Sequence, residues 1–275
     1  MLNKYPFLLL LLLPLLVQAT ILSGRVVDQE TDEPISYVNI GVLQGERGTV
    51  SSDQGYFRLD LADISKESIL RFSFIGYENF DVSVGDIEQK CVGLCEIKMI
   101  PQVLEFDEVL VYPREFKEKV VGNPHPPAVM KAGFTEDSLG YEVGVRCKIR
   151  NRPTLLEELR LHGIVTSYDS VFYRLNVYEM YQKMPGRNIL REPIYVTLTN
   201  FDTHSEFVID LMPYHIMVQD DFLITLEYVK ELGEGELQFS TGMLSGKIFY
   251  RRTSQAEWHS APLGLGMSVL ISYEK

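Results

Sequence analysis

Apolar and polar residues alternate singly in three segments near the start of the chain, 37–42, 56–61 and 70–74. A period of two is typical of half-buried β-strands, whose alternate side chains enter a core and face solvent. In the first segment the apolar set is Val38, Ile40 and Val42. The opposite set, expected to face solvent, is Tyr37, Asn39 and Gly41. Short strands of this kind, separated by polar turns, predict an antiparallel β-sandwich.

The stretch GTVSSDQGYFRLDL, at 48–61, joins two of these strands. We expect the Asp53 side chain to accept backbone hydrogen bonds and start a turn, and Gly55 to close it with a positive φ. A phosphate-binding loop would need a helix after the glycine, with its first amides aimed at the anion. A strand pattern follows instead, so the stretch predicts a turn and no phosphate site.

Alternation returns in the second half of the chain, most clearly in VFYRLNVYEM at 171–180. One face of this strand would carry Val171, Tyr173, Leu175 and Val177. The other face would carry Phe172, Arg174, Asn176 and Tyr178. Turn signals at 185–186, 233–235 and 242–246 separate further apolar segments. Their spacing predicts a second sandwich of about eight strands over 136–275.

Residues 101–135 differ in character from the segments on either side. The stretch GNPHPPAVMKAG, at 122–133, contains three prolines and predicts an extended connector. The expected layout is therefore a sandwich over 20–100, a linker over 101–135 and a second sandwich over 136–275. The fold class that follows is all-β.

The first residues, MLNKYPFLLLLLLPLLVQAT, have the pattern of a secretory signal peptide. Lys4 precedes an apolar run from Phe7 to Val17, and Val17 and Ala19 fit the small-residue positions of a cleavage site after residue 19. The run is short for a membrane span, and a retained anchor is the alternative. We expect the chain to be exported to the periplasm, the outer membrane or the cell surface, with no integral span after cleavage.

The formal net charge of −12 argues against nucleic acid and anionic membrane surfaces as partners. Three cysteines are present, and export would permit disulfides. Cys91 and Cys95 are four residues apart, which favours a disulfide between them or free thiols over a metal pair, because no histidine is close in sequence. Cys147 is expected to be a small core residue.

Five blocks of the first half also carry a family resemblance: GRVVD at 24–28, EPI at 33–35, VNI at 38–40, GTVSSDQGYF at 48–57 and FSFIGY at 72–77. In this order and spacing they resemble the carboxypeptidase-regulatory-like domain, a transthyretin-like sandwich of seven strands. The resemblance implies an accessory module without catalytic residues, of the kind found in exported proteins of Bacteroidetes-type bacteria. The second half carries its own blocks: residues 140–145, FYRLNVY at 172–178, PGRNIL at 185–190, DLMPYHIMVQDDFLITLEYV at 210–229 and RRTSQAEWH at 251–259. These blocks resemble the C-terminal half of uncharacterised proteins that carry this module, which implies a two-domain protein of no known activity.

Motifs for catalysis or metal binding are not recognisable in the sequence. The five histidines form no HxH, HxxxH or HExxH pair, and there is no GxSxG. A triad using Ser254 and His259 has no specific support. Asp220 and Asp221 are adjacent, so on a strand they would point to opposite faces. We therefore expect a non-enzymatic protein without a metal or cofactor.

The segment RRTSQAEWHSAP, at 251–262, is the candidate interaction surface. It holds Arg251, Arg252, Trp258 and His259, and tryptophan beside arginine is frequent in binding interfaces. The alternative is that Trp258 belongs to the core. Tyr173, Tyr178 and Tyr181 could add a sugar-binding face, although their spacing places them on two faces of a strand.

Together these features predict an exported accessory protein of the bacterial envelope that binds a protein partner. A carbohydrate-binding protein is the first alternative. A small hydrolase with a site assembled from distant residues is the least favoured.

Overall fold

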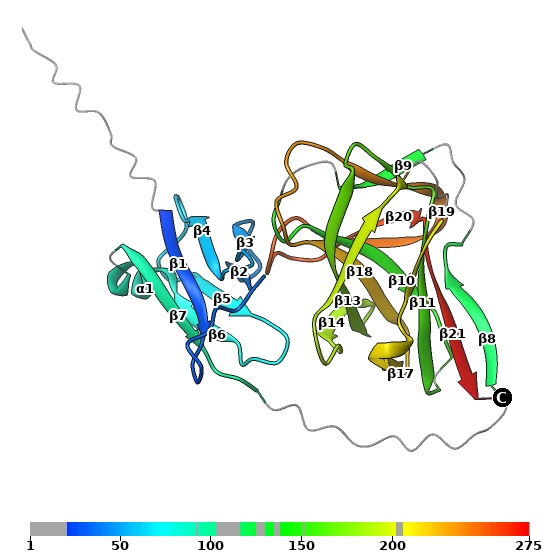
Figure 1. Cartoon of the computed structure of the whole chain (residues 1–275), viewed down its shortest axis with the longest axis horizontal. Helices are drawn as coiled ribbons and strands as arrows, with labels where there is room; N and C mark the ends of the chain where they lie inside the picture. Colours follow the sequence, from blue (N-terminus) through cyan, green and yellow to red (C-terminus); the bar gives the residue numbers. More distant parts are fainter. Residues whose placement is uncertain are drawn as a thin grey trace, which may run out of the picture.

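A computed structural model describes residues 21–91, 93–102, 116–124, 130–134, 138–150, 152–201 and 206–274. The predicted signal peptide lies outside these residues. The described chain forms a smaller N-terminal unit and a larger C-terminal unit, both made of β-sheets (Figure 1). The all-β fold class is thereby confirmed. Among the helices of the described residues, none has the length and apolar character to cross a membrane.

The first domain contains seven strands in two sheets. The strands are β1 (Ile21–Asp28), β2 (Asn39–Val42), β3 (Gly48–Val50), β4 (Tyr56–Asp60), β5 (Ile69–Ser73), β6 (Phe80–Ser83) and β7 (Leu94–Met99). One sheet has the order β4-β1-β7 and the other β3-β2-β5-β6. The predicted apolar sets of β2, β4 and β5 enter the core between the sheets, and the largest side chains there include Phe57 and Phe72.

A short helix, α1 (Val84–Lys90), connects β6 to β7 and was not predicted from the sequence. The Ser83 side chain caps it by accepting a hydrogen bond from the Asp86 amide at 3.1 Å. Cys91 lies at the other end of the helix and forms a disulfide with Cys95 on β7, with Cα atoms 5.0 Å apart.

The turn at 52–55 differs from the expectation in one detail. Gly55 has a φ of +77°, and its amide donates to the Ser52 carbonyl at 3.0 Å. The side chain that accepts backbone amides is Ser52, from Gln54 and Tyr56, and it is not Asp53. A hydroxyl one residue earlier supplies the acceptor that was assigned to the carboxylate. The stretch is a turn between strands, as predicted.

The second domain is built from a nine-stranded sheet and a five-stranded sheet. The strands of the larger sheet are β9 (Met130–Phe134), β10 (Glu142–Cys147), β12 (Val165–Thr166), β13 (Ser170–Tyr181), β14 (Met184–Asn188), β15 (Ile194–Thr199), β18 (Phe222–Tyr228), β19 (Leu237–Arg251) and β20 (His259–Leu265). Those of the smaller sheet are β8 (Phe116–Gly122), β11 (Thr154–His162), β16 (Glu206–Asp210), β17 (Met217–Val218) and β21 (Met267–Glu274). A 3₁₀ turn, η2 (Met212–Tyr214), precedes β17. Cys147 is buried in the core between the two sheets, as expected.

Two expectations about this domain are wrong. The predicted linker 101–135 contains β8, which pairs with β21, and β9, which pairs with β19. Every residue of β8 except Val121 is exposed, so this edge strand has no apolar alternation to reveal it. The count of about eight strands is too low, because the described residues of 136–275 form twelve, β10 to β21, and two of these, β12 and β17, have only two residues each. The predicted turn at 242–246 lies inside β19, at an irregularity in its pairing with β20.

The faces of β2 and β13 that were expected to face solvent pack against the other domain instead. Tyr37, beside β2, contacts Phe172 and Tyr195 with ring centroids 5.4 Å away in both cases. Asn39 and Arg174 are hydrogen-bonded to each other across the junction. The sheets that contain β2 and β13 therefore cover part of each other's second face.

The two domains also come into close contact between β2, β3 and the segment 253–255. Gly41 and Gly48 are directly paired on these strands, and the Ser254 carbonyl lies over both. A Cβ at either glycine would collide with that carbonyl. Next to it, the Gln44 amide donates to the Gln255 carbonyl at 3.0 Å, and Gln255 Nε2 donates to Ser73 Oγ at 2.7 Å.

Candidate functional site

A cleft of about 720 Å³ lies between the two domains. The first domain contributes Asn39, Arg71, residues 73–79 and Gln102. The second domain contributes Arg174, Asn176, Tyr178, residues 186–190, Arg251, Gln255 and Trp258. Its volume lies within the range of about 300–1,000 Å³ that is typical of ligand sites.

Two buried ion pairs form the floor of this cleft. Arg174 on β13 contacts Glu227 on β18 at 2.8 Å, and Arg251 on β19 contacts Glu142 on β10 at 2.6 Å. Both carboxylates have no exposed side-chain surface. These residues meet because β10, β13, β18 and β19 lie within one sheet, and all four side chains project from the face opposite the core.

Further side chains satisfy both carboxylates completely. Asn176 Nδ2 bridges them, donating to Glu142 at 2.9 Å and to Glu227 at 2.8 Å. Glu142 also accepts from the hydroxyls of Thr225 and Tyr178. Each carboxylate oxygen thus has at least one donor, which is the condition for burying charge at tolerable cost.

The pKa values of the two carboxyl groups are shifted in opposite directions. Burial raises the pKa of Glu142 above its ordinary value, and the charge of Glu227 adds to this although Arg251 opposes it. Burial also acts on Glu227, but the charges of Arg174 and Arg251 hold its pKa below the ordinary value. Both arginines therefore favour the charged form of Glu227, Arg174 from 2.8 Å and Arg251 from 3.9 Å.

The floor extends into the first domain through Arg174 and Asn39. Arg174 Nη1 donates to the Tyr37 carbonyl at 2.7 Å, and its Nη2 donates to Asn39 Oδ1. Asn39 Nδ2 in turn donates to Glu227 at 2.8 Å. The same charged group therefore holds the sheet of one domain against a strand of the other.

One wall of the cleft is the loop that follows β5, residues 74–79. Tyr77 fixes it by donating its hydroxyl to Asp28 at 2.8 Å. Hydrogen bonds, first from the Thr31 amide and then from Tyr77, lower the pKa of Asp28. Burial, and next the bond to Asp28, raise the pKa of Tyr77 to about 12. Asn79 and Gln102 are exposed at the outer edge of this wall.

The opposite wall comes from β14 and from the loop before β20. Arg187 on β14 has an exposed side chain and lies 3.9 Å from Glu179. Trp258 is half-buried, with the Arg251 guanidinium 5.0 Å from its ring centroid and the Tyr178 ring 5.4 Å away, edge to face. The indole therefore lines the cleft and is held there by two residues of the floor.

The structure separates the four residues of the predicted interaction surface. Arg251 is in the buried floor and Trp258 is at the wall, so these two lie together. Arg252 and His259 are exposed and do not line the cleft. His259, on β20, lies beside Tyr250 of β19. Ser254 is buried at the domain junction, which removes it from contact with any substrate.

Sequence reasoning missed Asn39, Glu142, Arg174 and Glu227 as members of a site. The available signal was a charged residue inside an otherwise apolar strand, as Glu227 is in FLITLEYV. Such a residue on a strand is buried only if something covers its face, and alternation does not reveal what covers a face.

The other candidate residues do not come together as a sugar-binding, catalytic or metal-binding site. Tyr173 is in the core, Tyr178 is in the floor and Tyr181 is exposed beyond it, so the three form no common surface. Asp221 is bound by Arg146 at 2.6 Å and accepts the Ile149 amide. In the part of the chain that the structure describes, no three His, Cys, Asp or Glu side chains are grouped to hold a metal ion. His125 and His204 lie outside that part.

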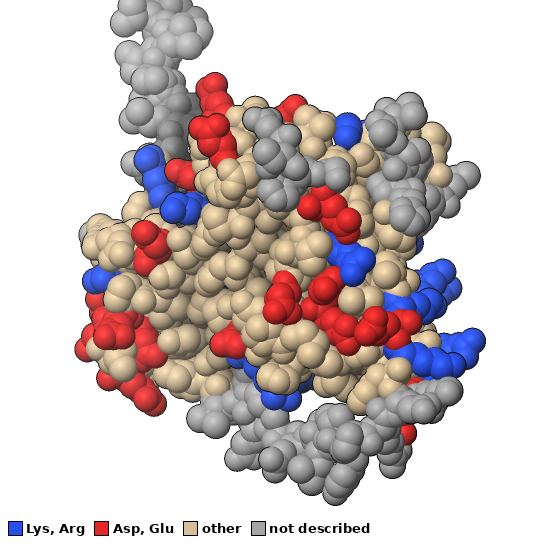
Figure 2. All heavy atoms as spheres, turned by 45° about the vertical axis from the view of Figure 1, so that its right-hand side comes forward, with Lys and Arg blue, Asp and Glu red and all other residues tan. Residues whose placement is uncertain are grey.

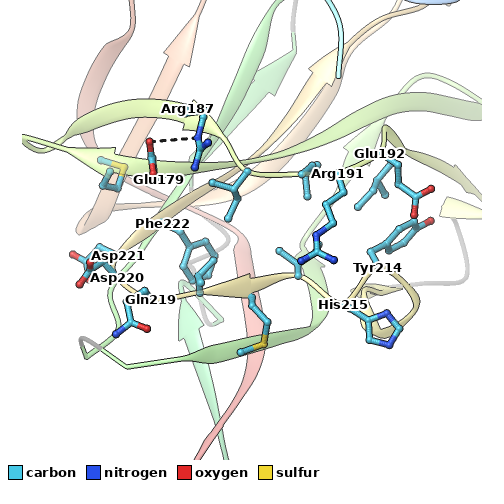
Figure 3. Close-up of a pocket in the computed structure, with 17 residues that line it drawn as sticks. Glu179, Arg187, Arg191, Glu192, Tyr214, His215, Gln219, Asp220, Asp221 and Phe222 are labelled. Carbon is cyan, nitrogen blue, oxygen red and sulfur yellow. Dashed lines mark ion pairs between the residues drawn. The ribbon is translucent and has the colours of Figure 1, made fainter. Parts of the chain in front are cut away.

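A second hollow, of about 340 Å³, lies wholly within the second domain. Figure 3 shows Arg191, Glu192, Tyr214 and His215 at one end of it and Gln219, Asp220 and Asp221 at the other. The Phe222 ring lies between the two ends, and the Arg187–Glu179 contact borders the hollow (Figure 3). It is smaller than the interdomain cleft and contains no tryptophan.

On the face of the molecule drawn in Figure 2, acidic and basic side chains lie next to one another. This face does not present a continuous basic area of the kind that binds nucleic acid. The overall charge of −12 agrees with this observation.

Comparison with known proteins is informative for the first domain. No curated protein matches the chain. One solved structure, of the infectious bursal disease virus Gt strain, is 10% identical with a TM-score of 0.25, and the match covers 92% of this chain and 62% of the viral chain. A TM-score of that size carries no argument. The family model of the CarboxypepD_reg-like domain matches residues 22–111, and this match confirms the resemblance, including the transthyretin-like sandwich, for that part of the chain.

Proposed function

We propose that the chain is an exported, non-enzymatic binding protein of the bacterial envelope, and that its binding site is the interdomain cleft. The observation that carries the proposal is the position of Trp258, the single tryptophan of the chain, on the wall of a polar cleft whose floor is already hydrogen-bonded. A floor fixed in advance reduces the cost of ordering on binding. The signal-peptide pattern and the presence of the module support export and an accessory role.

The shape and polarity of the cleft bear on the kind of partner. Protein partners commonly use flat apolar patches or exposed strand edges. The cleft is concave and lined mainly by carboxamides, arginines and aromatic side chains. These features favour a polar ligand with a defined outline, and a protein partner would have to insert a loop or chain end.

One observation raises the hydrolase alternative, because Glu142 and Glu227 converge on the same Asn176. A catalytic acid or base must come within hydrogen-bond distance of the reacting group. Both carboxylates have no exposed side-chain surface and are bound by arginines. They therefore stabilise the cleft in this arrangement, and we propose no reaction for them.

The proposal is tested in cells with the photo-crosslinker p-benzoylphenylalanine placed at position 187, on the wall of the cleft. One matched control replaces Lys119, which is exposed on β8, away from the first domain (Figure 1). Because Arg187 also lines the second hollow, the other control replaces the exposed Arg191, which lines that hollow and not the cleft. An adduct formed at 187 and at neither control position, whether of protein or of glycan mass, supports the cleft as the binding site. Equal labelling at 187 and at either control position, or labelling at a control position alone, contradicts it.

A further inference from the structure

We infer that the ligand of the interdomain cleft is an uncharged oligosaccharide. This inference rests on the proposed function, since it names the ligand class for the same site. It follows from the balance of charge in the cleft, from the hydrogen-bonding groups at its surface and from its aromatic side chains.

The charge of the cleft is balanced within the protein. Four arginines line it, at positions 71, 174, 187 and 251. Three of them contact carboxylates at 2.6 to 2.8 Å, namely those of Asp81, Glu227 and Glu142. Arg187 lies 3.9 Å from Glu179, and Glu78 adds a further negative charge to the lining. An anionic ligand would have to compete with these carboxylates, so the arginines do not make an anion site.

Carboxamides are the most numerous uncharged polar groups in the lining: Asn39, Asn79, Asn176, Asn188, Gln102 and Gln255. A carboxamide both donates and accepts, as a sugar hydroxyl does, so the two groups can exchange paired hydrogen bonds. The inner amides are committed to the floor, where Asn188 donates to Asn176 at 2.9 Å. The exposed Asn79 and Gln102 are the amides placed to meet a ligand.

Aromatic side chains complete the site. Trp258 on one wall and Phe74 and Tyr77 on the other offer apolar surface beside polar groups. The C–H faces of pyranose rings pack on such surfaces while their hydroxyls reach the surrounding amides. The cleft volume of about 720 Å³ also gives room for more than one sugar ring.

The test uses the fluorescence of Trp258, which reports only on the cleft because the chain has one tryptophan. The full mature chain is titrated with neutral oligosaccharides of glucose, mannose, xylose and N-acetylglucosamine, and with acidic oligosaccharides of galacturonate and mannuronate. We expect a neutral oligosaccharide to change the emission, with a Kd that changes by less than about twofold between about 50 mM and about 500 mM NaCl. The double variant Asn79→Ala/Gln102→Ala should weaken this binding about tenfold or more, since two hydrogen-bonding groups are lost. Arg252→Ala, an exposed change outside the cleft, is the control and should leave it unchanged.

The possible failures are distinguishable. Binding of acidic oligosaccharides alone, with a Kd that rises steeply with salt, overturns the inference and keeps the cleft as the binding site. The absence of any response to the panel, together with a protein adduct at position 187, overturns the inference in favour of a protein partner. No preference for position 187 over position 119 contradicts the proposed function itself.

Discussion

Arg174 of the second domain donates to the backbone carbonyl of Tyr37 in the first, at 2.7 Å. The same guanidinium contacts Glu227 within its own sheet. A single buried cation therefore neutralises a carboxylate of one domain and also holds the backbone of the other. We expect its replacement to affect the stability of the second domain and the contact between the two domains.

Replacing Arg174 by methionine should destabilise the protein by about 3–5 kcal/mol, because it leaves the buried Glu227 without its partner. The free energy of unfolding, measured by urea denaturation, checks this value. Adding Glu227→Gln to Arg174→Met should recover part of the loss, with a coupling energy of about 0.5–3 kcal/mol. Strictly additive losses would show that the two groups act independently.

Gly41→Ala and Gly48→Ala should each weaken the domain junction without changing either core. The added methyl group meets the Ser254 carbonyl, and relief of this overlap should cost about 1–3 kcal/mol. Calorimetry should show a lower or divided unfolding transition, and hydrogen exchange should increase at residues 253–255. Gly186→Ala is the control, since its nearest neighbour is a flexible side-chain atom of Glu179 at 3.2 Å. An equal effect in all three variants would contradict the assigned role of the glycine pair.

Tyr77→Phe should reduce stability near neutral pH and alter its dependence on pH. Asp28 has a lowered pKa, so its contribution is present above its ordinary value of 3.8 and is lost as the pH falls through the lowered value. Tyr77 has a raised pKa, so its contribution is present below its ordinary value of 10.0 and is lost as the pH rises towards about 12. The difference in unfolding free energy between the wild type and Tyr77→Phe should therefore be greatest between these limits. A difference that is constant from acid to alkaline pH would exclude the Asp28 bond as its cause.

The emission of Trp258 should report separation of the domains before either domain unfolds. The indole packs against Arg251 and Tyr178, whose positions depend on the interdomain floor. In Arg174→Met, the emission maximum should move to longer wavelength at a lower urea concentration than that at which the far-ultraviolet circular dichroism is lost. Coincident transitions in this variant would show that the cleft and the sheets open together.

The sequence allowed the strands of the first domain, their alternation and the position of the Gly55 turn to be predicted. For β2 and β13 it also placed the correct residues on each face. The predicted environment of the second faces was wrong, because Asn39 and Arg174 are polar and polar residues on a strand normally face solvent. Here the two polar faces satisfy each other. Trp258 and Arg251 could be selected from the sequence because their residue types are frequent in binding interfaces. Glu142 and Glu227 could not, because their positions in the site depend on pairing between strands distant in sequence.

The Gly41–Gly48 pair and Asn39 have a consequence for exchanging modules between proteins. CarboxypepD_reg-like domains can be compared by their cores. In the first domain, however, the residues that contact the next domain lie on the face of β2 and β3 that points away from its core. A chimera that keeps the second domain and receives a module with a bulky residue at either glycine position would lack room for the Ser254 carbonyl. A donor module should therefore be chosen by its residues at the positions equivalent to 39, 41 and 48. A module that differs there would need residues 253–255 of the second domain to be redesigned with it.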